Sequence, residues 1–142
     1  MKAVQISIFL ENTGGRIAEA TSILANADIN IKAISLADTA DFGVLRLIVN
    51  DVDKAEKALK GEGFTVGKTN VVAVNVSDKP GGLNKILQIL SEGDINVEYI
   101  YALKQANDHA IMIFRFDNTD NAIKVLESKG VKIFSGEEVY AM

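Results

Sequence analysis

Two strand-to-helix turns in this sequence carry the residues best suited to bind a small charged molecule. Each turn has a polar residue followed by two glycines, in Asn12-Thr13-Gly14-Gly15 and in Asp78-Lys79-Pro80-Gly81-Gly82. Free N–H groups at a helix start, together with the positive end of the helix dipole, favour a bound carboxylate. Asp78 could accept a hydrogen bond from an ammonium group, and Asn12 could donate or accept one. The turns therefore predict a site for a zwitterionic amino acid.

A purely structural role is the alternative for these polar residues. Asn and Asp are common helix N-caps, so the physical argument alone favours capping for Asn12 and Asp78. Asn30 and Asn96 each start a later strand, where asparagine is often a turn former. Its occurrence at the same place in both copies favours a functional role. Arg16, directly after the first glycine pair, is placed to reach an anion at that turn.

The elements that position these residues occur twice along the chain. At an offset of 66 positions, Gly15, Ile23, Leu24, Asp28, Ile29, Asn30 and Ile34 match Gly81, Ile89, Leu90, Asp94, Ile95, Asn96 and Ile100. After Asp51 and Asp117 the offset becomes 67. The one extra residue of the second copy is expected in a turn, where insertions are tolerated.

Both copies show a βαββαβ pattern. Alternating apolar residues predict first strands over 4–11 and 72–77, and helical spacing predicts helices that follow and end near Ala27 and Gly93. Further strands are expected over 29–36, 43–50, 95–103 and 110–116. Second helices are expected over 53–60 and 119–129, and a last strand is expected after each. Asp53 and Thr119 are the predicted N-caps of these helices, and Gly63 and Gly130 are predicted to end them.

This order predicts an α+β fold with two ferredoxin-like units in tandem, an antiparallel sheet in each with its helices on one face. A chain of 142 residues then divides into two units of about 70 residues, at 1–69 and 70–142. The third strands are apolar on both faces, and such strands are usually covered on both sides. A second copy of the chain is expected to supply part of the cover, so we predict a homodimer.

Composition excludes several classes of function. The chain has no cysteine and one histidine, so thiolate metal sites, redox sites and the usual nucleophilic triads lack their residues. Neither of the two glycine-rich nucleotide-binding motifs, GxxxxGK[ST] and GxGxxG, occurs in the sequence. A net charge of −4 opposes nucleic-acid binding, and no apolar run is long enough to cross a membrane. We expect a cytoplasmic protein without catalytic residues, metal or cofactor.

Two segments of the sequence resemble a known family. The segment 76–83 with Ile86, Leu90 and Ile95-Asn96-Val97 resembles the ACT domain, and 12–17 through Ile29-Asn30-Ile31 resembles a second copy without the usual proline. Together the two copies cover essentially the whole chain. The resemblance implies modules that bind small effectors, most often amino acids, and that regulate metabolic enzymes to which they are fused or docked.

The resemblance also implies which residues bind the effector. ACT ligands typically lie between two units, held by the first strand-to-helix loop of one unit and the second strand of its neighbour. By position, the loop contacts would be Asn12, Gly14, Gly15, Arg16 and Ile17 in one site and Asp78, Pro80, Gly81, Gly82 and Leu83 in the other. The strand contacts would be Asn30, Ile31, Asn96 and Val97. Gly14 replaces the family's proline and Asn12 its common aspartate, so the two sites need not bind alike.

We therefore expect a non-catalytic regulatory protein that binds a free amino acid between ACT units and signals to a separate metabolic enzyme. One alternative is a regulatory subunit of a biosynthetic enzyme that acts by protein contact and binds no small molecule. A ferredoxin-like enzyme is the third possibility. It would need a cleft with titrating groups, which this sequence does not display.

Overall fold

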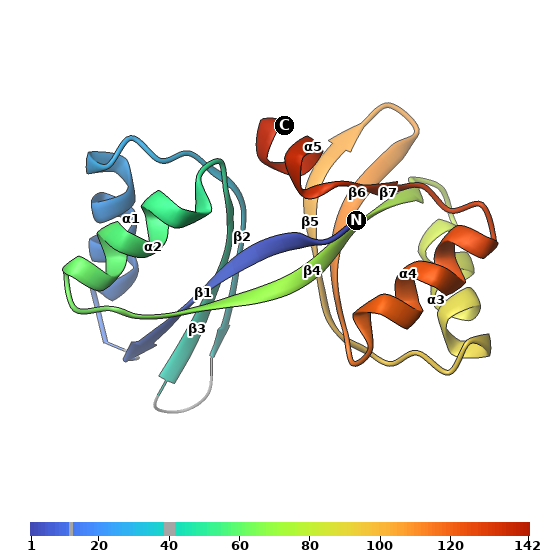
Figure 1. The fold of residues 1–142 in the computed structure, drawn as a ribbon, viewed down its shortest axis with the longest axis horizontal. Helices are drawn as coiled ribbons and strands as arrows, with labels where there is room; N and C mark the ends of the chain where they lie inside the picture. Colours follow the sequence, from blue (N-terminus) through green and yellow to red (C-terminus); the bar gives the residue numbers. More distant parts are fainter. Residues whose placement is uncertain (12, 39–41) are drawn as a thin grey trace. The chain divides into compact units, whose positions relative to one another are not determined.

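The chain follows the predicted βαββαβ order twice and adds one helix (Figure 1). The structure is a computed structural model, and it describes residues 1–11, 13–38 and 42–142. This order confirms the predicted α+β fold of two ferredoxin-like units. The elements are β1 (Ala3–Glu11), α1 (Arg16–Asn26), β2 (Ile31–Asp38), β3 (Phe42–Val49), α2 (Val52–Gly61), β4 (Thr65–Ser77), α3 (Gly82–Glu92), β5 (Val97–Ala106), β6 (His109–Phe116), α4 (Thr119–Ser128), β7 (Ile133–Phe134) and α5 (Gly136–Ala141).

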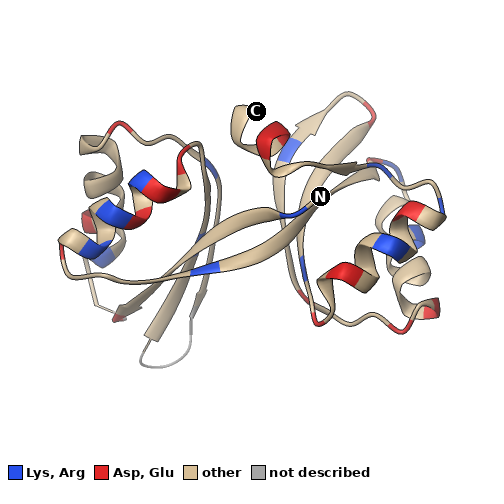
Figure 2. Cartoon of the chain, in the orientation of Figure 1, with Lys and Arg blue, Asp and Glu red and all other residues tan. Residues whose placement is uncertain are grey.

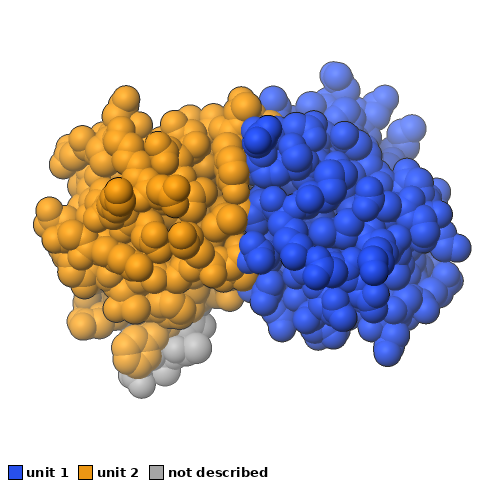
Figure 3. Space-filling view, viewed as in Figure 1, with its two compact units in different colours: residues 1–3, 70–139 blue, residues 4–69, 140–142 orange. Residues whose placement is uncertain are grey.

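The two compact units exchange short terminal segments. Unit 1 contains residues 1–3 and 70–139, and unit 2 contains residues 4–69 and 140–142, coloured blue and orange in Figure 3. Strand β4 therefore contributes its beginning to unit 2 and the rest to unit 1. Each repeat is completed by a few residues from the far end of the chain.

Each unit has an antiparallel sheet with the strand order expected for a ferredoxin-like fold. Unit 2 has the order β2-β3-β1-β4. In unit 1, β4 lies between β7 and β6, and β5 forms the edge beyond β6. The two helices of each unit lie on one face of its strands (Figure 1).

The core of each unit lies between that sheet face and the helices. In unit 2, alternate β1 residues meet both helices, as the predicted alternation required: Ile6, Ile8, Leu10, Leu24 of α1 and Leu59 of α2. The corresponding set in unit 1 is Val72, Val74, Val76, Leu90 of α3 and Leu126 of α4. Burial of these amphipathic faces is the main force that holds each unit together.

The extra residue of the second repeat is Leu103, and it lies in a strand. In β5, Ala102 pairs with Met112 of β6 while Lys104 pairs with Ile111, so Leu103 has no opposing residue. The pairing of β2 with β3 shows no such shift between Ala33 and Asp38. The sequence-based placement in a turn after the third strand was therefore wrong. A β-bulge accommodates one additional residue in one strand of an antiparallel pair.

The second helix of each unit starts earlier than its predicted cap. Asp51 is the N-cap of α2, and its Oδ1 accepts a hydrogen bond from the Lys54 N–H at 3.1 Å. Asn118 caps α4 in the same way. The predicted caps, Asp53 and Thr119, lie inside the helices. Both real caps have extended backbone, which lets the side-chain oxygen turn back to a free amide.

These caps lead to a first testable prediction. Replacing Asp51 by alanine is expected to lower the free energy of unfolding by about 1 kcal/mol, because an amide at the start of α2 loses its acceptor. Asp53→Ala removes the same charge but no capping bond, so its loss is expected to be under half as large. Urea denaturation measures both. An equal effect of the two substitutions would contradict the assigned cap.

The four long helices end where the sequence predicted. Ala27 and Gly93 are the C-caps of α1 and α3. Gly63 and Gly130 follow the C-caps of α2 and α4 with φ angles of 84° and 74°. That left-handed conformation stops a helix and favours glycine, so the predicted stops are confirmed.

Helix α5 was not predicted. The last strand of unit 1, β7, has two residues, and α5 follows it directly. Ser135 and Glu138 exchange hydrogen bonds at the start of α5, from Ser135 N–H to Glu138 Oε1 at 3.0 Å and from Glu138 N–H to Ser135 Oγ at 3.2 Å. This is a capping box, a helix signal that the sequence carried. The Ser135 amide also holds the pKa of Glu138 below its usual range.

The distribution of charge agrees with the sequence. Residues of both signs are interspersed along the helices (Figure 2), with a net charge of −4. Within the described ranges, none of the helices has the length and apolar character that a membrane span requires.

Candidate functional site

The double-glycine turns place a glycine in the left-handed region directly before each helix. Gly15 and Gly81 are the N-caps of α1 and α3, with φ angles of 86° and 87°, and neither helix has a side-chain cap. The capping alternative is therefore wrong for Asp78, which lies three residues before Gly81. Asn12 lies outside the described residues. In α3 the Gly82 N–H donates to the Lys79 carbonyl at 2.9 Å, and without a side-chain cap the other first-turn amides of the two helices are left for solvent or a ligand.

The turn of unit 1 is tied to the β5–β6 hairpin. Gln105, near the end of β5, donates a hydrogen bond from Nε2 to Oδ2 of Asp78. The Asp78 N–H donates to the Asp108 carbonyl at 2.8 Å. Asp78, Pro80 and Gly81 are exposed, whereas Gly82 and Leu83 are half-buried. The Asp78 carboxylate is thus held at the surface beside the uncapped start of α3, and sequence reasoning missed Gln105.

The turn of unit 2 differs at Arg16. Its Nη1 pairs with Glu19 Oε2 at 2.8 Å, and its guanidinium lies 4.3 Å from the centre of the Phe64 ring. Gly14, Gly15 and Ile17 are exposed. Arg16 and Ile17 also line a cavity of about 50 Å³ together with Leu36 of β2, which is too small for more than a water molecule or two. Arg16 is therefore engaged inside its own unit through Nη1 and its ring contact, whereas its buried Nε has no hydrogen-bond partner among the described residues.

Asn30 and Asn96 lie immediately before β2 and β5. Their backbone N–H groups donate to side-chain oxygens at the end of the third strand, Asn30 to Asn50 Oδ1 at 2.9 Å and Asn96 to Asp117 Oδ1 at 3.1 Å. The amides of Asn50 and Asp117 donate back to the two asparagine carbonyls at 3.2 Å. This exchange fixes each strand start and leaves the carboxamides of Asn30 and Asn96 exposed. Sequence reasoning missed Asn50 and Asp117, although they occupy equivalent positions in the two repeats.

The two halves of the predicted site do not meet inside one unit. In unit 1, the 78–83 loop lies at the start of α3 and Asn96 follows its end. An eleven-residue helix spans about 16 Å at a rise of 1.5 Å per residue. One amino acid therefore cannot contact the loop and the strand start of the same unit. A ligand that uses both halves has to take them from two different units.

A cavity of about 430 Å³ lies at the strand start of unit 1. It is lined by Asn96 and Val97 from the predicted site, by Asp117, and by residues from the end of α3 and the following turn. The exposed Asn96 carboxamide can donate and accept hydrogen bonds there. This volume is within the range of small-molecule sites.

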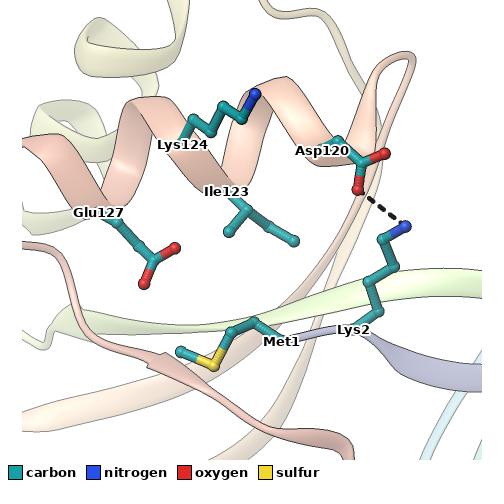
Figure 4. A pocket seen from close by; sticks show the side chains of 6 residues that line it. All are labelled: Met1, Lys2, Asp120, Ile123, Lys124 and Glu127. Atoms are coloured by element: carbon teal, nitrogen blue, oxygen red, sulfur yellow. Dashed lines mark ion pairs between the residues drawn. The ribbon is translucent and has the colours of Figure 1, made fainter.

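A larger hollow of about 700 Å³ lies elsewhere in unit 1, between Met1, Lys2 and helix α4. Figure 4 shows Lys2 reaching across to Asp120, while Ile123 points toward Met1. The Lys2 Nζ lies 2.8 Å from Asp120 Oδ1, and this contact holds the pKa of Asp120 below its usual range. None of the predicted site residues lines this hollow.

The carboxyl groups whose pKa values are shifted in the structure lie outside the predicted site. Hydrogen bonds from Lys60 to Glu56 and from Lys2 to Asp120 lower the pKa values of these two carboxyls. Such shifts are typical of surface ion pairs, whereas catalytic acids are usually tuned toward neutral pH. Across the described part of the chain, no three His, Cys, Asp or Glu residues come together as a metal site would require.

Comparison with solved structures identifies the fold and a relative. The chain is 43% identical to protein BT0572 from Bacteroides thetaiotaomicron, covering 100% of this chain and 98% of that one, with a TM-score of 0.94. It shares its fold with the ligand-free regulatory subunit of aspartate kinase from Thermus thermophilus, at 19% identity, 88% and 91% coverage and a TM-score of 0.61. Aspartokinase III from E. coli, solved with lysine and aspartate, gives 17% identity, a TM-score of 0.54, and coverage of 89% of this chain and 31% of the enzyme.

At these lower identities, the two aspartate kinase likenesses concern the fold alone. A comparison with curated proteins gave no match. The profile of the ACT domain pair matches residues 1–142, the length over which the two repeats were recognised. The chain belongs to the ACT domain pair family.

Proposed function

We propose that the chain is a non-catalytic regulatory protein that binds a free amino acid at interfaces between ACT units and passes the bound state to a separate metabolic enzyme. The observation that carries the proposal is the repeated turn: Gly15 and Gly81 precede helices without a side-chain cap. Such a helix start is suited to the carboxylate of an amino acid. In unit 1, Asp78 holds an exposed carboxylate nearby that is suited to the ammonium group.

The proposed contacts come from both halves of the site. The loop residues are Asn12, Gly14, Gly15, Arg16 and Ile17 in one repeat and Asp78, Pro80, Gly81, Gly82 and Leu83 in the other. The strand residues are Asn30, Ile31, Asn96 and Val97. Because loop and strand lie at opposite ends of a helix, each site needs a second unit, and a homodimer of two such chains supplies further units. We take residues 1–69 and 70–142 as the two effector-binding modules.

Regulation follows from linkage. A ligand held by two units favours the arrangement in which both sets of contacts are made, and it stabilises that arrangement by its difference in affinity. Proteins that share the fold fit this role, since they include a regulatory subunit of aspartate kinase and an aspartokinase solved with lysine and aspartate. A cytoplasmic amino-acid biosynthetic enzyme is the class of partner that we propose.

A contact-only regulatory subunit is the second candidate. Four large apolar side chains of unit 2 are about half exposed or more: Phe9 at 50%, Ile34 at 49%, Leu36 at 50% and Phe42 at 60%. Apolar surface of this kind is typical of sites that contact another protein. If no small molecule binds, this surface becomes the basis of the function.

Thermal unfolding against each of the twenty amino acids tests the proposal. A ligand at about 100 times its dissociation constant adds about 2.7 kcal/mol and raises the midpoint by several degrees. We expect one amino acid to give this shift, and we expect Asp78→Ala or Asn12→Ala to remove it in whichever copy carries the site. Asp108→Ala is the matched control, because it removes an exposed carboxylate from the neighbouring hairpin.

Two results would reject the amino-acid site. If none of the twenty shifts the midpoint, the contact-only subunit becomes the better description. If an amino acid gives a shift that survives both Asp78→Ala and Asn12→Ala, the ligand binds elsewhere and the loop assignment is wrong. Analytical ultracentrifugation with and without the amino acid measures whether the chain is a dimer and whether the ligand strengthens it.

A further inference from the structure

A further cavity in unit 1 has only lysines as its charged lining residues. It has a volume of about 290 Å³ and lies between the start of α3, the end of α4 and the segment that leads into β7. Lys85, Lys129 and Lys132 line it, and no carboxylate does. Its apolar wall consists of Ile86, Ile89 and Val131, and its other lining residues are Asn75, Ser77, Gly82 and Gly130.

The positive charge of this cavity is only partly balanced. Lys132 lies 3.9 Å from Glu138 and 5.1 Å from the centre of the Phe134 ring. Neither Lys85 nor Lys129 takes part in an ion pair with any described residue. In a protein with a net charge of −4, three lysines around one cavity create a local positive potential that attracts anions.

Two other lining residues help to define this cavity. The Oδ1 atom of Asn75 is buried, and the part of the protein that the structure describes offers it no hydrogen-bond partner. This oxygen is a hydrogen-bond acceptor, so its partner is a water molecule or a ligand hydroxyl and not an oxygen of a phosphate dianion. Gly82 is required at the rim, since a Cβ atom there would lie 1.9 Å from the Ser77 carbonyl oxygen. The cavity therefore has a polar acceptor without a protein partner, and Gly82 is required there by the Ser77 backbone.

The other repeat shows the same place filled and its charges reversed. At the repeat offset, the residues that correspond to Gly82, Lys85, Lys129 and Val131 are Arg16, Glu19, Glu62 and Phe64. Arg16 pairs with Glu19 at 2.8 Å and lies 4.3 Å from the Phe64 ring centre. Unit 2 thus neutralises this region with its own side chains, whereas unit 1 leaves it open and positive.

We propose that the lysine-lined cavity of unit 1 binds a phosphate group carried by a small molecule with an apolar part. A phosphate dianion matches several lysines, which bind phosphate as point charges. Ile86, Ile89 and Val131 supply the contact surface for the apolar part. The volume is near the lower end for small-molecule sites, which limits the occupant to a small phosphate ester.

This site is separate from the proposed amino-acid site. Gly82 is the one residue that the two share. Asp78 bonds to Gln105 of β5, whereas the cavity is lined by residues of the segment that leads into β7, and β7 pairs with the edge of β4 opposite to β6. The two proposals therefore stand or fall independently.

Nuclear magnetic resonance of the full chain, titrated with phenyl phosphate and with inorganic phosphate at constant ionic strength, tests the proposal. We expect saturable shifts of the Gly82 and Gly130 amides, and no saturable shift of Gly15 or Gly63. Tighter binding of phenyl phosphate identifies an ester as the occupant, and equal binding identifies inorganic phosphate itself. The first result supports the proposed ester, and the second would overturn its apolar part.

Charge reversal gives the decisive variants. Lys85→Glu and Lys129→Glu introduce the residues found at the same positions of unit 2, so we expect them to fold and to weaken binding at least tenfold, the loss expected for a hydrogen bond to a charged group. Lys57→Glu, on α2, changes the net charge equally and is expected to leave binding unchanged, as is Asp78→Ala. Shifts that do not saturate, or that Lys57→Glu reduces as much as Lys129→Glu does, would overturn the site.

Discussion

Replacing Gly82 by alanine is expected to lower the free energy of unfolding by about 3 kcal/mol, the upper part of the usual range for overpacking. A Cβ atom at this position would lie 1.9 Å from the carbonyl oxygen of Ser77 and 2.8 Å from its carbonyl carbon. Both are backbone atoms, so the clash cannot be relieved by rotating a side chain. The end of β4 or the start of α3 has to move.

Helix propensity favours alanine over glycine, but this gain is too small to offset the clash with the Ser77 backbone. Gly82 is the first residue of α3, where alanine gains at most about 1 kcal/mol over glycine. Gly81→Ala is the matched control. Gly81 has a φ angle of 87° but no atom within 4 Å of an added Cβ, so its cost is backbone strain alone, about 1–2 kcal/mol. Urea denaturation compares the two variants, and an equal loss would mean that the turn relaxes around the new methyl group.

Phe114→Ala is expected to have the largest effect of any single truncation named here, a loss of about 3–5 kcal/mol. The Phe114 side chain is fully buried on β6 and stacks on Phe116, with ring centres 5.5 Å apart. Its removal leaves a cavity bounded by strands and helices of unit 1. These elements can close around it only partly, because the neighbouring side chains already pack at high density.

An exposed phenylalanine provides the control for this truncation. Phe9 on β1 is 50% exposed, so Phe9→Ala is expected to cost less than about 1 kcal/mol. Denaturation followed by circular dichroism measures both variants. Comparable losses would show that Phe9 is covered in solution, as it would be in a dimer, and dilution would then reduce the effect of Phe9→Ala.

The elements of the fold could be predicted because their causes are local. Ile6, Ile8 and Leu10 alternate along one strand, and the alternation alone indicates which face meets the helices. Gly63 and Gly130 stop helices through their own backbone conformation. Such features depend on a few consecutive residues, so the sequence contains the whole argument.

The features that were missed depend on contacts between distant residues. Leu103 forms a bulge because β5 pairs with β6, and the repeat offset locates an insertion only between the nearest matching residues. The choice between Asp51 and Asp53 as the cap depends on which residue has extended backbone. Helix α5 is the exception, because Ser135 and Glu138 form a readable capping box in the stretch after the last predicted helix.

In the candidate site, too, some features depend on neighbouring residues and others on contacts between distant residues. The glycine turns could be located from sequence, since a left-handed glycine before a helix leaves a recognisable pattern. The bonds of Asp78 with Gln105 and of Arg16 with Glu19 and Phe64 determine what each turn can bind. Phe64 is far from Arg16 in sequence, so only the folded unit shows that this arginine has a partner in its own repeat.

The exchange of terminal segments has a consequence for how the protein is made. Residues 4–69 are synthesised well before residues 140–142, yet the Val4 N–H donates to the Tyr140 hydroxyl at 2.7 Å and Lys32 Nζ donates to the Met142 carbonyl at 3.0 Å. Residues 1–3 likewise have partners, such as Asp120, that are synthesised much later. Although domains usually fold in order of synthesis, the first repeat here cannot make all of its contacts until the second repeat has been synthesised.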